Sequence, residues 1–265
     1  MATEKLWKNH VFWCYGSAAT AFGIKNNAFS YLLLLYCTEV LGIAGFKASI
    51  ALAVAMIWDA VSDLLLGHWS DKTSSRLGRR HPFMYAALLV LPISFYLLFD
   101  PAIELHEDNA FMYVLLMALL IRTGTTLFEM PSTALLPDLE KDYDRRNQWL
   151  SLRYFFGWYG GNGIHIVNMM FWAGAYGFAV QRGYTIYATV GALLIFFSIV
   201  ISSFGTQREA SALPRPADTF KLRDIASEVG QIFESLKNPN FKALFLYGLT
   251  VGIAGGLGMA LYLYN

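Results

Sequence analysis

The residues best suited to chemistry are two aspartates inside a long apolar stretch. Asp59 and Asp63 are four residues apart in WDAVSDLLLGHW, which places them one turn apart on the same face of a helix. Two carboxylates held this close in apolar surroundings repel each other, and a cation between them or a proton on one removes the repulsion. Ionisable residues inside a membrane span are costly and usually functional. We therefore predict that Asp59 and Asp63 bind a coupling cation, an alkali ion if that cation is a metal.

The composition indicates a helical membrane protein. Hydrophobic residues make up 56% of the 265 residues and charged residues only 15%, against about 25% in a typical soluble domain. The charges fall in short clusters between long apolar runs, which is typical of a chain that crosses the membrane several times. The net charge of +1 gives no indication of a nucleic-acid partner.

Seven apolar runs have the length of membrane-spanning helices. They lie at about 11–41, 46–69, 83–99, 110–136, 149–179, 184–204 and 243–264. Lys and Arg are concentrated in the loops on the side of the N-terminus, which predicts a cytoplasmic N-terminus. We expect a multi-pass protein of the plasma membrane, or of the inner membrane in a bacterium.

The runs divide the chain into three predicted parts. Residues 1–205 form a six-helix transmembrane domain, residues 206–242 a cytoplasmic linker, and residues 243–265 a seventh helix that starts a second domain. Within the linker, Phe220–Leu236 has the apolar spacing of an amphipathic helix on the membrane surface.

Further charges lie at membrane depth, namely Lys25, Arg122, Glu129 and Arg153. With the two aspartates they make three acids and three bases, and this balance suggests mutual pairing around one polar cavity. Arg122, Thr126 and Glu129 share one helix face, so the Thr126 hydroxyl can lie beside the carboxylates. Oxygen ligands of this kind suit sodium, lithium or a proton.

Simpler interpretations of these residues stay open. The charges can serve only to join helices, Arg122 can hold a nearby carboxylate in place, and Arg153 can extend to the membrane surface. Gly157 and Gly161 favour close helix contact. Trp158 and Tyr154 can stack on a sugar ring, although most aromatic residues in such a chain face lipid or the core.

Two stretches carry a family resemblance. GHWSDKTSSRLGRR, at 67–80, resembles the loop signature of the major facilitator superfamily between helices two and three. With WDAVSD before it and HPF after it, it resembles the glycoside–pentoside–hexuronide:cation symporters, the melibiose-permease family. EMPSTALLPDLEKDYDRRNQWLSLRYFF resembles that family from the end of helix four to the start of helix five.

The resemblance spans nearly all of the chain and implies an architecture. It implies an all-α membrane protein with the N-terminal six-helix half of a major facilitator fold, followed by the first helix of the C-terminal half. It also implies that the remainder of a second half would complete the cavity. We expect that these 265 residues alone do not transport.

The resemblance also assigns roles to residues of the cation site. Asp59 and Asp63 match the family's paired cation-binding acids, and Thr126 matches a threonine near the cation. Glu129 stands where melibiose carriers have an aspartate that serves both cation and sugar. The predicted cation-binding residues are therefore Asp59, Asp63, Thr126 and Glu129.

Other matches concern the solute and the loop. Lys25 and Arg153 match a lysine and an arginine near the sugar, and the predicted substrate-binding set is Lys25, Asn26, Arg122, Glu129, Arg153 and Trp158. Asn26 and Thr133 depart from the family, which has an acid and a sugar-stacking tryptophan there, so the solute need not be a galactoside. Residues matching the loop's gating and charge-network positions are Gly67, Asp71, Arg76, Gly78, Arg79 and Arg80.

These observations predict a secondary active transporter that couples sodium or a proton to symport of a sugar, glycoside or hexuronide by alternating access. A relative carrying an amphipathic lipid or another small solute is the open alternative. A retinal receptor would need a lysine in the last helix, and 243–264 has none. No G-x-S-x-G or H-E-x-x-H motif indicates an enzyme. We expect no cofactor besides the coupling ion, and as partners a small solute, the surrounding lipid and the second half.

Overall fold

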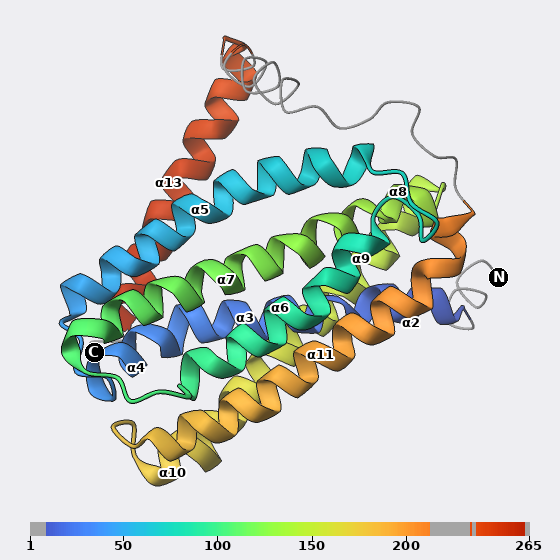
Figure 1. The fold of residues 1–265 in the computed structure, drawn as a ribbon. Coiled ribbons are helices and arrows are strands. Elements are labelled where there is room, and N and C mark those ends of the chain that lie inside the picture. Colours follow the sequence, from blue (N-terminus) through green and yellow to red (C-terminus); the bar gives the residue numbers. More distant parts are fainter. Residues whose placement is uncertain (1–8, 213–233, 235–236, 263–265) are drawn as a thin grey trace. The chain divides into compact units, whose positions relative to one another are not determined.

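The computed structural model describes residues 9–212, 234 and 237–262, apart from the side chains of 107–108 and 256–262. The chain divides into two compact units, Met1–Ala217 and Asp218–Asn265. Throughout the described residues the secondary structure is helical, without a strand (Figure 1). The all-α class predicted from the sequence is confirmed.

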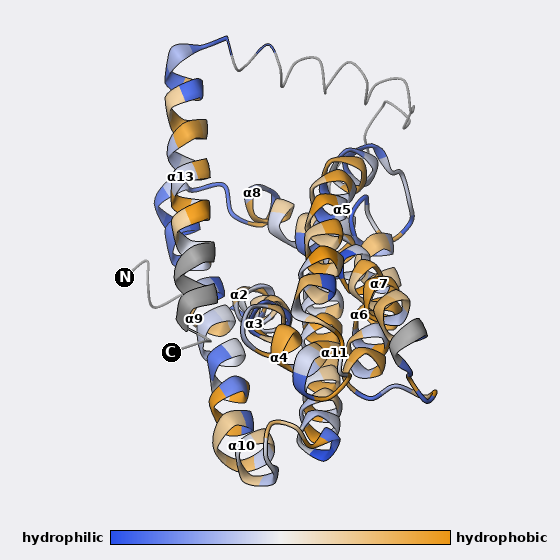
Figure 2. Cartoon of the chain, turned by 90° about the vertical axis from the view of Figure 1, so that its left-hand side faces the viewer, coloured by the Kyte–Doolittle hydropathy of each residue, from blue (hydrophilic) through white to orange (hydrophobic). Residues whose placement is uncertain are grey.

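Four helices in the described part are long and apolar enough to cross a membrane. They are α5 (Gly45–Lys72), α6 (His81–Phe99), α7 (Glu107–Ala134), which continues into the short α8 (Leu136–Leu139), and α11 (Gln181–Ser211). Figure 2 shows hydrophobic residues along much of α5. The second unit contains α13 (Pro239–Tyr262), which corresponds to the seventh predicted span.

The first and fifth predicted spans are each divided into consecutive helical segments. The first consists of α2 (His10–Ser17), α3 (Ala19–Asn27), the π-helical η1 (Ala28–Leu32) and α4 (Leu33–Glu39). The fifth consists of α9 (Tyr143–Val167), the π-helical η2 (Asn168–Trp172) and α10 (Ala173–Tyr176). Short π-helical turns inside α-helices are frequent at functional sites.

Two helices extend beyond the apolar runs that predicted them. The α9 helix begins at Tyr143 rather than at 149, because the Asp142 side chain accepts the backbone N–H of Asp144 at 2.9 Å and caps the helix. The α11 helix continues past 204, with Thr206 and Ala210 still buried. Hydropathy therefore located these helices but underestimated their lengths. The predicted linker helix at 220–236 lies almost wholly outside the described residues, and the three-part division of the chain stays a prediction.

Glycines allow α3 and α9 to pack with their backbones in contact. A methyl group added to Gly23 would overlap the carbonyl of Gly157, and one added to Gly161 would overlap the backbone of Gly23. The prediction that Gly161 permits close helix contact is confirmed, whereas a methyl group on Gly157 would lie 3.4 Å from the Ala19 Cβ atom, an ordinary contact. This contact brings the first and fifth spans together beside the cavity described below.

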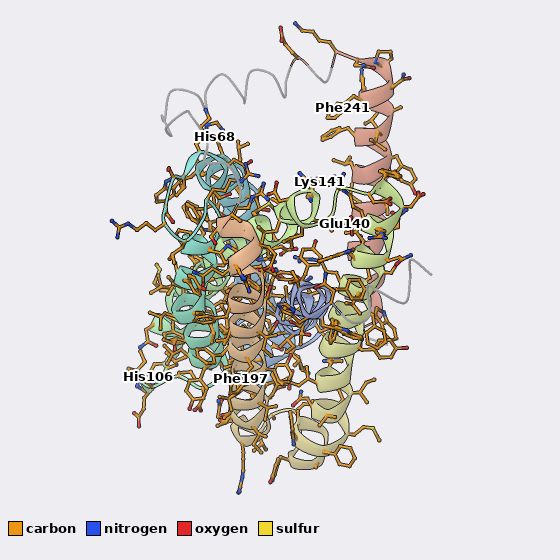
Figure 3. All side chains as sticks on the ribbon, turned by 90° about the vertical axis from the view of Figure 1, so that its right-hand side faces the viewer. His68, His106, Glu140, Lys141, Phe197 and Phe241 are labelled. Atoms are coloured by element: carbon orange, nitrogen blue, oxygen red, sulfur yellow. The ribbon has the colours of Figure 1, made fainter. Side chains whose placement is uncertain are left out.

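The first unit has two polar ends. At one end, Asp100 accepts hydrogen bonds from Tyr96 at 2.5 Å and from Thr185 at 2.8 Å, joining α6 to α11. The connection at 73–80 and the α8–α9 segment lie at the other end, which we call the loop end. Figure 3 shows His68 and His106 towards opposite ends of the unit, with Glu140 and Lys141 in the α8–α9 segment.

Candidate functional site

Charged side chains from three spans gather inside the first unit. Lys25 on α3 is only 3% exposed and lies within electrostatic range of Asp59 and Asp63 on α5 and of Arg122 and Glu129 on α7. We call these five residues the inner charge cluster. Lys25 is buried and the other four are half-buried, and shielding so many charges in an apolar bundle is favourable only when they compensate one another, which the three acids and two bases largely do.

One direct ion pair crosses the cluster. The Arg122 Nη1 atom lies 2.7 Å from the Asp59 Oδ2 atom and donates a hydrogen bond to it, tying α7 to α5. The guanidinium also lies over the Phe29 ring, 4.8 Å from its centroid. Both side chains are shielded, with 14% of Arg122 and 25% of Asp59 exposed. Arg122 therefore neutralises the first of the two predicted cation-binding acids.

A pair of hydroxyl groups lies near the second acid. The Thr126 and Ser62 hydroxyl oxygens lie 3.1 Å apart across α5 and α7, and the Thr126 hydroxyl also interacts with the Asp63 carboxylate. Thr126 and Ser62 are both buried. The helix periodicity that placed Thr126 beside the acids thus agrees with the geometry. Carboxylate and hydroxyl oxygens of this kind are suitable ligands for a hard cation.

The other two members of the cluster are Lys25 and Glu129. Neither the Lys25 ammonium nor the Glu129 carboxylate makes an ion pair or a side-chain hydrogen bond within the part of the chain that the structure describes. Among the described residues, no group of three or more His, Cys, Asp and Glu side chains is arranged to hold a metal ion. Any cation site here would thus rely on hydroxyl or other neutral oxygens beside the carboxylates.

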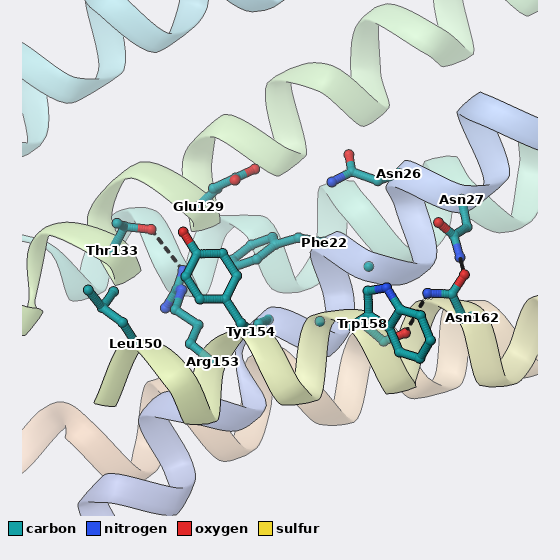
Figure 4. Close-up of a pocket in the computed structure, with 13 residues that line it drawn as sticks. Phe22, Asn26, Asn27, Glu129, Thr133, Leu150, Arg153, Tyr154, Trp158 and Asn162 are labelled. Carbon is teal, nitrogen blue, oxygen red and sulfur yellow. Dashed lines mark hydrogen bonds between the residues drawn. The ribbon is translucent and has the colours of Figure 1, made fainter. Parts of the chain in front are cut away.

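A cavity of about 590 Å³ lies between α3, α7 and α9 (Figure 4). Four of the six predicted substrate-binding residues line it, namely Asn26, Glu129, Arg153 and Trp158. Lys25 and Arg122 do not line it. The other lining residues are Ala19, Phe22, Gly23, Asn27, Thr133, Leu150, Tyr154, Gly157 and Asn162. Because Glu129 belongs both to the cavity wall and to the inner charge cluster, it connects the two.

Arg153 is the most buried cation on the cavity wall, at 8% exposure. Its Nη2 atom donates to the Ser132 hydroxyl at 3.0 Å and to the Thr133 hydroxyl at 2.8 Å. The guanidinium lies 5.0 Å from the Tyr15 ring centroid and 4.9 Å from that of Phe22. It makes no ion pair within the described residues, and its Nη1 atom has no hydrogen-bond partner there. Hydroxyls and aromatic rings thus hold a buried guanidinium at the cavity wall, without a carboxylate partner among the described residues.

An amide pair that was not predicted from the sequence lies on the cavity wall. The Asn27 amide nitrogen donates to the Asn162 side-chain oxygen at 3.1 Å, and Asn162 donates to the Trp158 carbonyl at 2.8 Å (Figure 4). The feature of the sequence that could have indicated it is the asparagine within the glycine-rich segment YGGNG of the fifth apolar run. Side-chain amides can bind solute hydroxyls as donor and as acceptor.

The loop end carries a second group of ion pairs. Arg79 Nη2 and Arg80 Nη1 each lie 2.7 Å from Asp138 Oδ2, and Arg80 Nη2 lies 3.2 Å from Asp71 Oδ1. We call Asp71, Arg79, Arg80 and Asp138 the loop-end clamp. Burial lowers the pKa of the Arg80 guanidinium, and Asp138 acts in the opposite direction. Asp138 was not among the predicted site residues, although it lies in the second stretch that carries the family resemblance.

The three remaining residues predicted at the loop have different surroundings. Gly78 has a φ of +93°, a conformation that side chains other than glycine rarely adopt, and a methyl group there would lie 3.3 Å from the Ala210 carbonyl oxygen. Gly67 lies within α5 beside open space, and Arg76 is exposed. The backbone conformation at position 78 therefore requires a glycine, whereas no comparable constraint acts on Gly67 or Arg76.

Helices of membrane-spanning length beside a cavity and a shielded charge cluster are typical of a solute carrier, and the comparisons with known proteins agree. Residues 14–265 match the family described as MFS/sugar transport protein. The chain belongs to this family of major facilitator transporters, and the expected resemblance is confirmed.

Several curated proteins are similar to the chain. An uncharacterized symporter from Synechocystis is 29% identical over 58% of the chain and 29% of that protein. The sodium-dependent lysophosphatidylcholine symporter 1 of Mus musculus is 27% identical over 53% of the chain and 27% of that protein. The raffinose carrier protein of Pediococcus pentosaceus is 24% identical over 95% of the chain and 42% of that protein. The matches thus cover less than half the length of each of these relatives. The family is one of multi-pass membrane transporters rather than enzymes.

Proposed function

We propose that the protein couples the entry of sodium or a proton to symport of a sugar, glycoside or hexuronide by alternating access. The observation that carries the proposal is the position of Glu129, which is part of both the solute cavity and the inner charge cluster. A cation that changes the charge balance of the cluster changes the field at Glu129 and hence at the cavity. Because such coupling is reciprocal, a bound solute must in turn strengthen cation binding.

In this proposal the cation binds at α5 and α7. Asp59, Asp63 and Thr126 supply its oxygen ligands, and Glu129 responds from the cavity side. Cation binding reduces repulsion among the acids, orders α5 against α7 and prepares the cavity for the solute. The loaded carrier then changes its direction of opening, as secondary transporters do.

The cavity walls support a solute that carries hydroxyl groups. Asn26 and the Asn27–Asn162 pair provide amides, and the exposed Trp158 and Tyr154 provide aromatic faces for a sugar ring. Because the Arg153 guanidinium lines the cavity and has no carboxylate partner among the described residues, it can bind either neighbouring hydroxyls or the carboxylate of a hexuronide. The similarity to a raffinose carrier supports the carbohydrate class.

Carriage of an amphipathic lipid is a second candidate, because several of the similar proteins are named as lysophosphatidylcholine symporters. Phe22, Leu150 and Trp158 give the cavity an apolar component that an acyl chain could contact. The Arg153 guanidinium would then bind the phosphate of the lipid head group.

Uptake into membrane vesicles that contain the protein at its natural full length would test the proposal. Labelled solute uptake would be measured with a sodium gradient, with a proton gradient and with neither, in competition with a neutral galactoside, a glucuronide and a lysophospholipid. We expect a gradient to stimulate uptake and one carbohydrate to compete. An uptake rate that is the same with and without each gradient would contradict coupling. Competition by the lysophospholipid alone would favour transport of a lipid.

We further propose that the N-terminus and the loop end face the cytoplasm. The basic residues of the 73–80 connection and of the 141–146 segment support this orientation. Labelling a single cysteine introduced at the exposed Arg76 with a membrane-impermeant reagent, in intact cells and in inverted vesicles, would test it. Labelling in intact cells would contradict the proposed orientation.

A further inference from the structure

The protein itself places a cation on one of the two acids of the proposed cation site. Arg122 Nη1 lies 2.7 Å from Asp59 Oδ2, within the distance of a charge-assisted hydrogen bond. The pair joins α7 to α5 inside the bundle, with only 14% of Arg122 and 25% of Asp59 exposed. The charge of Asp59 is therefore neutralised without any ion from solution.

Asp63, one turn further along α5, has different surroundings. Its carboxylate interacts with the Thr126 hydroxyl, and it makes no ion pair with Lys or Arg in the described part of the chain. The two acids that the sequence presents as equivalent thus differ. One is occupied by a guanidinium, and the other lies beside the Thr126 hydroxyl.

A sodium ion shared by the two acids would have to lie within a few ångströms of the Arg122 guanidinium. Two positive charges at such a distance repel strongly in surroundings less polar than water. The guanidinium and the sodium ion therefore exclude each other at Asp59. The Phe29 ring, 4.8 Å from the guanidinium carbon, gives the cationic side chain a second contact that does not depend on Asp59.

We propose that Arg122 is a tethered competitor of the coupling cation: it neutralises Asp59 in the empty carrier, and the entering cation displaces it from that acid. The inference rests on the proposed function, because it concerns regulation of the same cation site. In the empty carrier Arg122 then keeps the Asp59 carboxylate on α5 paired, and it lowers the apparent affinity of the site for the cation. Displacement of Arg122 frees a guanidinium inside the bundle and links cation entry to the contact between α5 and α7.

Sodium titration of the purified full-length protein would test the proposal. Sodium chloride would replace choline chloride at constant ionic strength and fixed pH, with binding followed by calorimetry and by the midpoint of thermal unfolding. The variants are Arg122→Gln and Arg122→Lys, with Arg182→Gln as the matched control, since Arg182 is exposed and lies outside the cluster. Arg122→Lys keeps a positive charge in the event that Arg122→Gln does not fold.

We expect Arg122→Gln to lower the sodium dissociation constant at least about tenfold, because the competing charge is gone. Arg122→Lys should lower it by a smaller factor, about threefold, because an ammonium lacks the planar fork that matches a carboxylate. Arg182→Gln should leave the sodium dissociation constant unchanged.

Sodium binding by Arg122→Gln alone would support the inference and contradict sodium coupling in the natural protein. Equal or weaker binding by both Arg122 variants would overturn the inference while leaving the proposed function intact. The absence of sodium binding in every variant would overturn the inference and exclude sodium as the coupling ion.

Discussion

The loop-end clamp and the inner charge cluster both join helices through Arg–Asp pairs 2.7 Å apart, but they differ in how fully their charges are paired. In the clamp, Asp138 accepts from two arginines, and Arg80 is paired on both terminal nitrogens. In the cluster, Lys25 and Glu129 have no ion-pair partner among the described residues. Complete pairing suits a contact that holds one arrangement of helices, whereas incomplete pairing leaves groups available to a cation or a solute.

The largest effect on stability should come from the clamp. Asp138→Asn leaves Arg79 and Arg80 side by side without their shared counter-charge, so we expect the free energy of unfolding to fall by about 3 kcal/mol. Thermal or denaturant unfolding in detergent would measure this loss. The control Asp144→Asn removes an exposed acid and should change the value by less than about 0.5 kcal/mol. A loss below about 1 kcal/mol in Asp138→Asn would mean that the clamp does not hold the loop end.

A substitution at Gly78 should have a smaller effect on the stability of the loop end. Gly78→Ala forces a side chain into the left-handed backbone region beside the Ala210 carbonyl and should cost about 1–2 kcal/mol of unfolding free energy. Gly67→Ala is the matched control, since it lies in a helix with open space around it and should be neutral or stabilising by up to about 1 kcal/mol. If the two substitutions had equal effects, the positive φ at Gly78 would not be needed.

On the cavity side, Arg153→Lys should weaken solute binding about tenfold and leave cation binding alone. Lysine keeps the charge but loses the planar guanidinium, whose Nη2 atom donates to both Ser132 and Thr133. Solute binding by calorimetry, with sodium titrated separately, would measure both effects. Arg145→Lys, at the exposed start of α9, is the control. An equal loss of cation and solute affinity would indicate that Arg153 acts on the whole bundle.

The smallest effect on stability should come from the cluster itself. Glu129→Gln removes a carboxylate without an ion-pair partner, so the free energy of unfolding should change by less than about 1 kcal/mol, whereas coupled uptake should be lost. Unfolding and gradient-driven uptake measured on the same preparation would show both results. A destabilisation as large as that of Asp138→Asn would remove the distinction between the two regions.

The sequence predicted what depends on periodicity within one helix. The spacing of Asp59 and Asp63, and that of Arg122, Thr126 and Glu129, placed each set on one face, and apolar runs located the helices of the described part. Partners across helices could not be predicted, because they depend on how far each helix is rotated and shifted along its axis. Residue spacing does not distinguish Asp59 from Asp63 as the partner of Arg122.

The same limit explains the differences at the cavity and at the loop end. Lys25 and Arg122 were grouped with the solute-binding residues, yet neither lines the cavity in this structure, and their roles stay predictions. The Asn27–Asn162 pair and the shared use of Asp138 depend on contacts between residues more than fifty positions apart. Helix ends at Tyr143 and Ser211 depend on a capping side chain and on tertiary packing, neither of which hydropathy measures.

Gradient-driven uptake by the full-length protein with Asp59→Asn beside the wild type would test the central claim most directly. If the inner charge cluster is the coupling site, the wild type responds to a sodium or proton gradient. Asp59→Asn then loses that response while still exchanging solute in the absence of a gradient. A response that is the same in both proteins would contradict the account and leave the buried charges as contacts between helices.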